Sequence, residues 1–196
     1  MEVKFRSTCP ASNAIDLIGD KWSLLIVRDI FLDTITYSEF LKSAEKISTN
    51  ILVDRLKKLI EAGFISFVKN PDDKKIKYYY LENKGIDLFP IICQMALWTR
   101  SYLPLNPIHP KAITLLNEID EKGIDQFVHD YISTYKLKRK KLTEDLDKAL
   151  KQEQGQGSSQ SLKMAGSINK LNRNTRSVRQ SLADHEEQKL GPDRNS

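Results

Sequence analysis

Apolar residues recur every three to four positions through most of residues 10–102, and this spacing is typical of amphipathic helices. It predicts four successive helices, over 10–18, from 20 to about 32, over 37–44 and over 48–62. Pro10 suits the first turn of the first helix, Asp20 can cap the second, and Gly63 suits the end of the fourth.

Two of these helices have recognisable start signals. Thr36 followed by Glu39 has the spacing of a capping box, in which each side chain satisfies a backbone N–H of the other residue. Ser48 offers a cap for the fourth helix. The apolar stripe of that helix is Leu52, Leu56, Leu59 and Ile60, and its other face carries Asn50, Asp54, Arg55, Lys57 and Lys58.

The pattern changes after Gly63. Two β-rich runs, 64–69 and 76–81, flank a polar Asn-Pro-Asp-Asp turn and predict a hairpin. Helical spacing resumes near Asn83, where Pro90 predicts a kink or a break into two pieces. Two further helical patterns within 111–152 are divided at Gly123.

The three helices that precede the hairpin, the hairpin itself and the helix after it follow the order of a winged helix-turn-helix, an α+β fold that is mainly α. We therefore expect a DNA-binding and dimerisation domain over 1–104 and a helical extension over 105–152. Residues 153–196 are rich in Gln, Ser, Asn, Gly and Arg, with too few apolar groups to offset the entropy of ordering. They predict a disordered tail, or a sequence of artificial origin.

Composition narrows the class of protein. The net charge of +5 is compatible with an anionic partner, and the apolar runs are shorter than the roughly 18 residues that cross a bilayer. The first residues lack the pattern of a secretory signal, so we expect a cytoplasmic protein without membrane attachment. Three scattered histidines, two cysteines and the lack of a Gly-rich phosphate loop predict no metal, no cofactor and no enzyme activity.

The fourth helix is the candidate reading element. Its first residues are small and polar, so they can approach base edges and phosphates, and a helix N-terminus itself attracts phosphate. In the hairpin turn four lysines outweigh two aspartates. The predicted contacts with double-stranded DNA are Ser38, Ser48, Thr49, Asn50, Arg55, Lys57, Lys74, Lys75 and Lys77, with Arg55 and Lys57 placed either on phosphates or in packing.

Two alternatives stay open at this point. The lysine-bearing faces could be ordinary solvated surfaces, which is the commoner case for a lysine-rich helix taken alone. The winged helix could also be a protein-interaction or dimerisation module that binds no specific DNA sequence. The cluster Lys138 to Lys141 is better explained as a solvated helix face than as a DNA contact.

A family resemblance adds to this interpretation. The stretch from Cys9 to Trp98 resembles the HxlR family of winged-helix regulators, relatives of the MarR-like proteins. The matching residues are Ile18-Gly19-Asp20-Lys21-Trp22, Leu24 to Asp29, Phe40, the pattern Ile47-Ser48-x-x-x-Leu52-x-x-Arg55-Leu56-x-x-Leu59-x-x-Ala62-Gly63, Tyr78-x-x-Leu81 and Lys84-Gly85. Glu82 and the segment 72–75 depart from the family, which often has Thr and a Pro-rich tip there.

The resemblance implies a transcriptional regulator, here expected to be a repressor. It also implies a homodimer joined through the first and last helices of the core, on a pseudo-palindromic operator. The apolar residues of the last core helix also support a dimer, because they form more apolar surface than a core of this size can cover. A two-fold partner is the commonest way to bury such a patch. The predicted interface residues are Ile15, Ile91, Met95, Trp98 and Tyr102.

Cys9 is a candidate sensor. It precedes Pro10 at a predicted helix start, and Lys4 and Arg6 are near it in sequence, all of which favour the thiolate. Members of the resembled family sense quinones, aldehydes or oxidants through a cysteine near this position, which implies a small-molecule or oxidant effector. The alternative is an inert thiol at the dimer seam. Cys93 is predicted to be a small buried hydrophobe.

Overall fold

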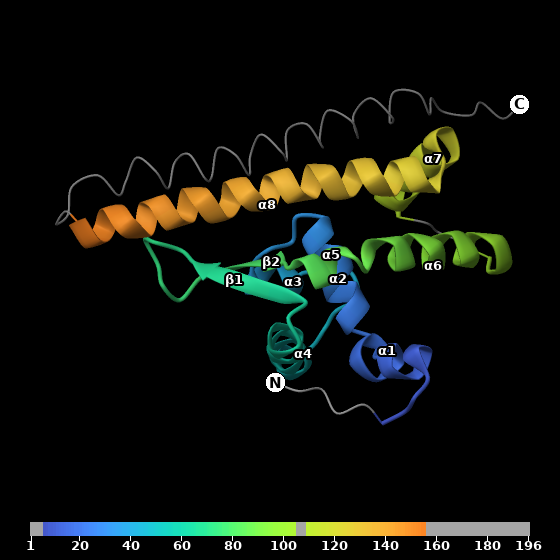
Figure 1. Ribbon diagram of the computed structural model, residues 1–196, viewed down its shortest axis with the longest axis horizontal. Coiled ribbons are helices and arrows are strands. Elements are labelled where there is room, and N and C mark those ends of the chain that lie inside the picture. The colour runs from blue at the N-terminus through green and yellow to red at the C-terminus, as the bar shows by residue number, and fades with distance from the viewer. Residues whose placement is uncertain (1–5, 105–108, 156–196) are drawn as a thin grey trace, which may run out of the picture. The chain divides into compact units, whose positions relative to one another are not determined.

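A computed structural model describes residues 6–104 and 109–155 of the chain (Figure 1). Of these, residues 6–104 and 109–147 belong to one compact unit, and residues 148–155 belong to a second. The elements are α1 (Pro10–Ile18), α2 (Ser23–Phe31), α3 (Tyr37–Phe40), α4 (Thr49–Glu61), β1 (Ile65–Lys69), β2 (Lys77–Leu81), α5 (Asn83–Ile86), α6 (Phe89–Tyr102), α7 (Pro110–Lys122) and α8 (Ile124–Gly155).

The core forms where α2 and α4 pack together. Val27 and Ile30 of α2 are fully buried, and so are three α4 residues at the spacing predicted for its stripe, Leu52, Leu56 and Leu59. Burying each such side chain contributes roughly 1.5–3 kcal/mol. This stripe therefore fixes the rotation of α4 about its own axis.

The third helix is shorter than predicted. The capping box is confirmed: Thr36 Oγ1 accepts from the Glu39 N–H, and Glu39 Oε2 accepts from the Thr36 N–H at 3.0 Å. The helix nevertheless ends at Phe40, so the predicted extent of 37–44 was wrong. The next turn is closed by i to i−3 bonds, and Lys46 has φ of 54°. This tight turn brings Ile47 into the core.

The predicted hairpin is confirmed. Strands β1 and β2 pair antiparallel, from Ile65 opposite Leu81 to Lys69 opposite Lys77. Gly63, with φ of 73°, turns the chain from α4 into β1. The outer edge of β2 also meets the core, since the Tyr79 N–H donates to the Ile35 carbonyl at 2.7 Å. The fold is a winged helix-turn-helix with a C-terminal helical extension.

Pro90 divides the helical segment after the hairpin into α5 and α6, as one of the two predicted alternatives had it. Pro90 occupies the first turn of α6, where a helix has no partner for a backbone N–H. Gly85 in α5 packs directly on the chain, because a Cβ there would lie 2.1 Å from the Phe64 carbonyl oxygen. A larger residue would force α5 away from the start of the hairpin.

The extension consists of α7 and α8, divided at Gly123 as predicted, and α8 continues to Gly155. Its apolar face joins the same core: Ile119, Phe127 and Tyr135 are buried in one cluster with residues of the winged helix. The rings of Phe89 and Tyr131 stack with their centroids 4.7 Å apart. Most of the predicted tail, 156–196, lies outside the described residues.

Asp20 stabilises the turn into α2. Its Oδ1 accepts from the N–H groups of Trp22 at 2.9 Å and Ser23 at 3.1 Å, its other oxygen accepts from the Ser23 hydroxyl, and Arg55 Nε lies 3.1 Å away. Partial burial alone would raise the pKa of Asp20, but these hydrogen bonds and the charge of Arg55 hold it below its ordinary value. The folded state therefore favours the ionised carboxylate.

We expect Asp20→Ala to lower the free energy of unfolding by about 1–2 kcal/mol at neutral pH, because two backbone N–H groups lose their acceptor. Since the pKa is lowered on folding, this contribution is complete above the unfolded value and is lost as the pH falls through the folded one. The difference from wild type in urea unfolding should thus shrink below about pH 4. The control is Asp87→Ala, at an exposed position. A difference that is constant down to acid pH would contradict this role.

Candidate nucleic-acid interface

The first turn of α4 projects into solvent. Ser48, Thr49 and Asn50 are all exposed, since the buried stripe begins only at Leu52. Ser48 stands at the N-cap position, but within the described structure its side chain makes no capping hydrogen bond. The hydroxyl and the first backbone N–H groups of the helix can therefore meet an anion from outside.

The short helix α3 lies against this exposed turn. The Tyr37 hydroxyl donates to the Thr49 carbonyl at 3.5 Å and so connects α3 to the start of α4. Ser38, next along α3, is exposed, with its Oγ 3.3 Å from Thr36 Oγ1. The structure thus connects α3, the helix that carries Ser38, to the start of α4.

Arg55 and Lys57 differ in their surroundings. The side chain of Arg55 is only 24% exposed, with its guanidinium 3.1 Å from Asp20 and 3.5 Å from Asp54, which favours the packing alternative. Lys57 is 73% exposed and makes a long 3.8 Å ion pair with Glu61. Exposed pairs of this kind contribute about 1 kcal/mol or less, so Lys57 can exchange Glu61 for a phosphate.

The turn between β1 and β2, together with the strand ends that flank it, forms the wing. Hydrogen bonds from side chains to the backbone shape its tip. Asn70 Oδ1 accepts from the Asp72 N–H at 2.8 Å, and Asp73 Oδ1 accepts from the Lys75 N–H at 3.0 Å. The exposed Lys74 and Lys75 thus stand on a tip where one of the two aspartates, Asp73, accepts a hydrogen bond from the backbone. Lys77 differs, since its ammonium lies 4.2 Å from the centre of the Phe67 ring.

The predicted dimer residues form an exposed apolar face. Ile91, Met95, Trp98 and Tyr102 are spaced four, three and four residues apart on α6, and Trp98 and Tyr102 are 58% and 71% exposed. Their rings contact each other, with centroids 5.5 Å apart. Ile15, on α1, is 66% exposed. Exposed apolar surface of this kind is typical of sites that bind another molecule.

The two cysteines have opposite environments. Cys9 is exposed at the N-cap of α1, and its N–H donates to Ser7 Oγ at 3.1 Å. Arg6 was expected to favour the thiolate, but its guanidinium forms an ion pair with Asp16 at 2.9 Å. Lys4 lies outside the described residues. Cys93 is buried, and burial raises the pKa of its thiol to about 11, which suits an inert hydrophobe.

Three functional contacts of α8 were not predicted from the sequence. Arg139 donates to the Leu81 carbonyl, Tyr135 accepts from the Leu81 N–H, and Lys138 lies 3.2 Å from Asp33. The solvated-face interpretation of the basic cluster was therefore wrong for Arg139, although Lys140 is exposed. The sequence does contain a signal for the Tyr135 and Arg139 contacts. Phe127, Tyr131, Tyr135 and Arg139 follow one another every four residues, which places them on one face of a helix.

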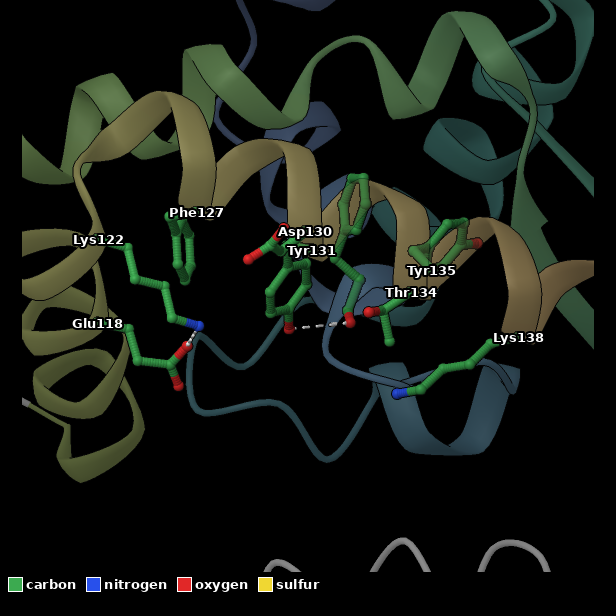
Figure 2. A pocket seen from close by; sticks show the side chains of 9 residues that line it. Glu118, Lys122, Phe127, Asp130, Tyr131, Thr134, Tyr135 and Lys138 are labelled. Atoms are coloured by element: carbon green, nitrogen blue, oxygen red, sulfur yellow. Dashed lines mark hydrogen bonds and ion pairs between the residues drawn. The ribbon is translucent and has the colours of Figure 1, made fainter.

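A hollow of about 180 Å³ lies beside the aromatic side chains of α8. Figure 2 shows Phe127, Tyr131 and Tyr135 in a row along its wall, with Lys122 and Glu118 paired at one end. Lys138, at the other end, pairs with Asp33. The lining holds two acidic side chains, Glu118 and Asp130, and two basic ones, Lys122 and Lys138, so it carries no net charge.

Over 6–104 and 109–155, no three His, Cys, Asp or Glu side chains are grouped as ligands for a metal ion. In the same residues no helix is both long enough and apolar enough to span a membrane.

Comparison with known proteins places this surface in context. Residues 17–107 match the profile of the HxlR-like helix-turn-helix family. The chain is similar to the uncharacterized HTH-type transcriptional regulator Rv3095 of Mycobacterium tuberculosis, with 32% identity over 46% of this chain and 57% of that protein. A second relative, the uncharacterized HTH-type transcriptional regulator sll1512 of Synechocystis, is 29% identical over 44% of this chain and 64% of its own length.

Among solved structures, that of PA1607, a candidate transcription factor, has 35% sequence identity. The likeness covers 53% of this chain and 72% of that one, with a TM-score of 0.48. The chain thus spans less than two thirds of the length of the two curated relatives, and the likeness is concentrated in the winged helix.

Proposed function

Residues 17–107 of this chain belong to the HxlR-like helix-turn-helix family, and from this premise we propose that the protein is a homodimeric transcriptional regulator that binds duplex DNA sequence-specifically. One observation carries the proposal: the first turn of α4 is exposed, and Ser48 at its N-cap makes no capping hydrogen bond. A helix of this width fits the major groove of B-form DNA.

Different residues supply specificity and affinity in this arrangement. Asn50 offers one donor and one acceptor, the pair that can bond both N6 and N7 of an adenine. Ser38, Ser48 and Thr49 are short hydrogen-bonding side chains suited to phosphates on either side. Lys57, Lys74 and Lys75 provide sequence-independent attraction. Lys77 contributes less, because Phe67 restrains its ammonium.

The two roles separate experimentally. We expect Asn50→Ala to weaken binding about ten- to a hundredfold on a duplex selected by the protein from a random pool, with little change on random DNA. Lys74→Ala and Lys75→Ala should weaken binding to every sequence, each flattening the dependence of log K on log salt by about one. Fluorescence anisotropy at several salt concentrations measures both effects.

The control for the lysine variants is Lys111→Ala, which removes an exposed lysine from α7. This variant should leave affinity and salt slope unchanged. A wild-type protein that enriches no sequence from the pool, and binds DNA only weakly, would contradict the proposal and favour the protein-interaction module.

The exposed apolar face supports the dimer. A second copy packed on Met95, Trp98 and Tyr102 would remove these side chains from water, and a two-fold arrangement lets one patch cover itself. Two α4 helices related in this way would reach half-sites about 34 Å apart, or a multiple of that, on a pseudo-palindromic operator.

We expect Met95→Glu to raise the dissociation constant of the dimer at least about tenfold, because it places an unpaired charge in the apolar contact. Sedimentation equilibrium measures the constant. The matched control is Leu137→Glu, at an α8 position that is 71% exposed. Equal masses for wild type and both variants at all concentrations would rule out this face as the interface.

Cys9 is the proposed effector site, and the proposed output is repression. The exposed thiol stands at the start of α1, the helix that also carries Ile15 of the predicted dimer interface. A modification here would alter the spacing of the two α4 helices. A dimer bound over a promoter would block transcription until Cys9 is modified.

Diamide with glutathione tests this switch. Diamide takes two electrons and two protons from the two thiols, leaving Cys9 in a mixed disulfide with glutathione. We expect wild type to gain one glutathione by mass and to release its operator and the blocked promoter, whereas Cys9→Ser does neither. Dithiothreitol should restore binding. Equal responses of both proteins to diamide would exclude Cys9 as the sensor.

A further inference from the structure

A row, or stripe, of side chains on one face of α8 packs against the winged helix. It consists of Phe127, Tyr131, Tyr135 and Arg139, each four residues from the next and so on one side of the helix. Phe127 and Tyr135 are buried, and the ring of Phe31 lies 4.7 Å from that of Tyr135. Figure 2 shows Tyr131 and Tyr135 side by side on this helix. The aromatic part of the stripe holds α8 against the core.

The polar end of the stripe meets the root of the wing at Leu81, the last residue of β2. The Leu81 N–H donates to the Tyr135 hydroxyl at 2.8 Å, and the Leu81 carbonyl accepts from Arg139 Nη1 at 3.0 Å. The other guanidinium nitrogen donates to Asn83 Oδ1 at 3.1 Å. Two side chains of α8 thus satisfy both backbone groups of one strand residue.

Over the described residues the sheet has two strands, and the outer edge of β2 is met by other parts of the chain. Near the middle of β2, Thr36 forms an isolated bridge with Tyr78, and at its end Tyr135 and Arg139 bond Leu81. Two residues further towards the wing tip, the same edge is held by the Ile35 carbonyl, which accepts the Tyr79 N–H. The core therefore holds the edge at Tyr79, and the extension holds it at Leu81. A buried N–H or carbonyl left unpaired would be costly, so this attachment resists displacement.

We propose that Tyr135 and Arg139 are positioning residues for DNA binding: they fix the root of the wing, so that Lys74 and Lys75 meet the DNA backbone while α4 occupies the groove. This rests on the proposed function. Strand geometry shows why the root matters, because β2 is about 13 Å long and a tilt of about 10° at Leu81 would move the far end by about 2 Å. A shift of that size breaks a hydrogen bond to phosphate.

A double-mutant cycle in salt dependence tests the proposal. The attachment is removed in Tyr135→Phe/Arg139→Met, and the tip charges are removed in Lys74→Ala/Lys75→Ala. The matched control is Lys140→Met, which deletes a charge from the next residue of α8, where the ammonium makes only a 3.9 Å ion pair with Glu144. The slope of log K against log salt is measured for wild type, each variant and the combination, after unfolding curves confirm that each is folded.

In wild type the lysine substitutions should flatten the slope by about two. The attachment variant should already be flattened by a similar amount, and adding the lysine substitutions should then change little. The control should behave as wild type. If the lysines flatten the slope equally with and without the attachment, Tyr135 and Arg139 do not position the wing, and the proposal is overturned.

Amide hydrogen exchange without DNA separates this result from a failure of the proposed function. The amides of β1 and β2 should exchange faster in the single variant Tyr135→Phe, which removes one oxygen, than in Lys140→Met. If the lysines prove irrelevant to the wild-type slope, the wing contacts of the proposed function fail. Unchanged exchange of the β2 amides in Tyr135→Phe would overturn the attachment itself.

Discussion

Burial of one face of α4 is the constraint on which the surface of this protein depends. Leu52, Leu56 and Leu59 enter the core beside α2, and the helix cannot rotate without exposing them to water. Because this apolar stripe starts a full turn inside the helix, the residues before it stay in solvent with unpaired backbone N–H groups. The same packing that stabilises the domain therefore creates the candidate reading surface.

The elements around α4 have complementary tasks. The Thr36 capping box and the Tyr37 hydroxyl hold α3 against the start of α4, and Asp20 connects the turn before α2 to Arg55 in the middle of α4. The wing is held from two directions, at Tyr79 by the core and at Leu81 by α8. The surface proposed to bind DNA is thus attached both to the core and to the extension.

Much of the fold could be predicted because its signals are local. Helical spacing, the capping box and the turn before β2 all lie within a few residues, so the hairpin and the α4 stripe were correctly placed. The end of α3 was missed, because Ile47 is drawn into the core by residues distant in sequence. Arg55 could not be assigned for the same reason, since Asp20 lies far from it along the chain.

The candidate site was predicted best where exposure follows from the helical stripe, as at Asn50. It was predicted less well where a lysine or arginine had a choice of partners. Composition cannot distinguish Arg139, which bonds the wing root, from its neighbour Lys140, which is solvated. The four-residue spacing from Phe127 to Arg139 does distinguish them, because it assigns Arg139 to the buried stripe.

The central claim is that the first turn of α4 enters the major groove. The most direct measurement places a photo-crosslinking amino acid at position 50, with position 137 on α8 as the control, and maps the adducts on a selected duplex. We predict crosslinks from position 50 to bases in the major groove of each half-site, and none from position 137. Equal crosslinking from both positions, or crosslinks from position 50 that ignore sequence, would contradict the account.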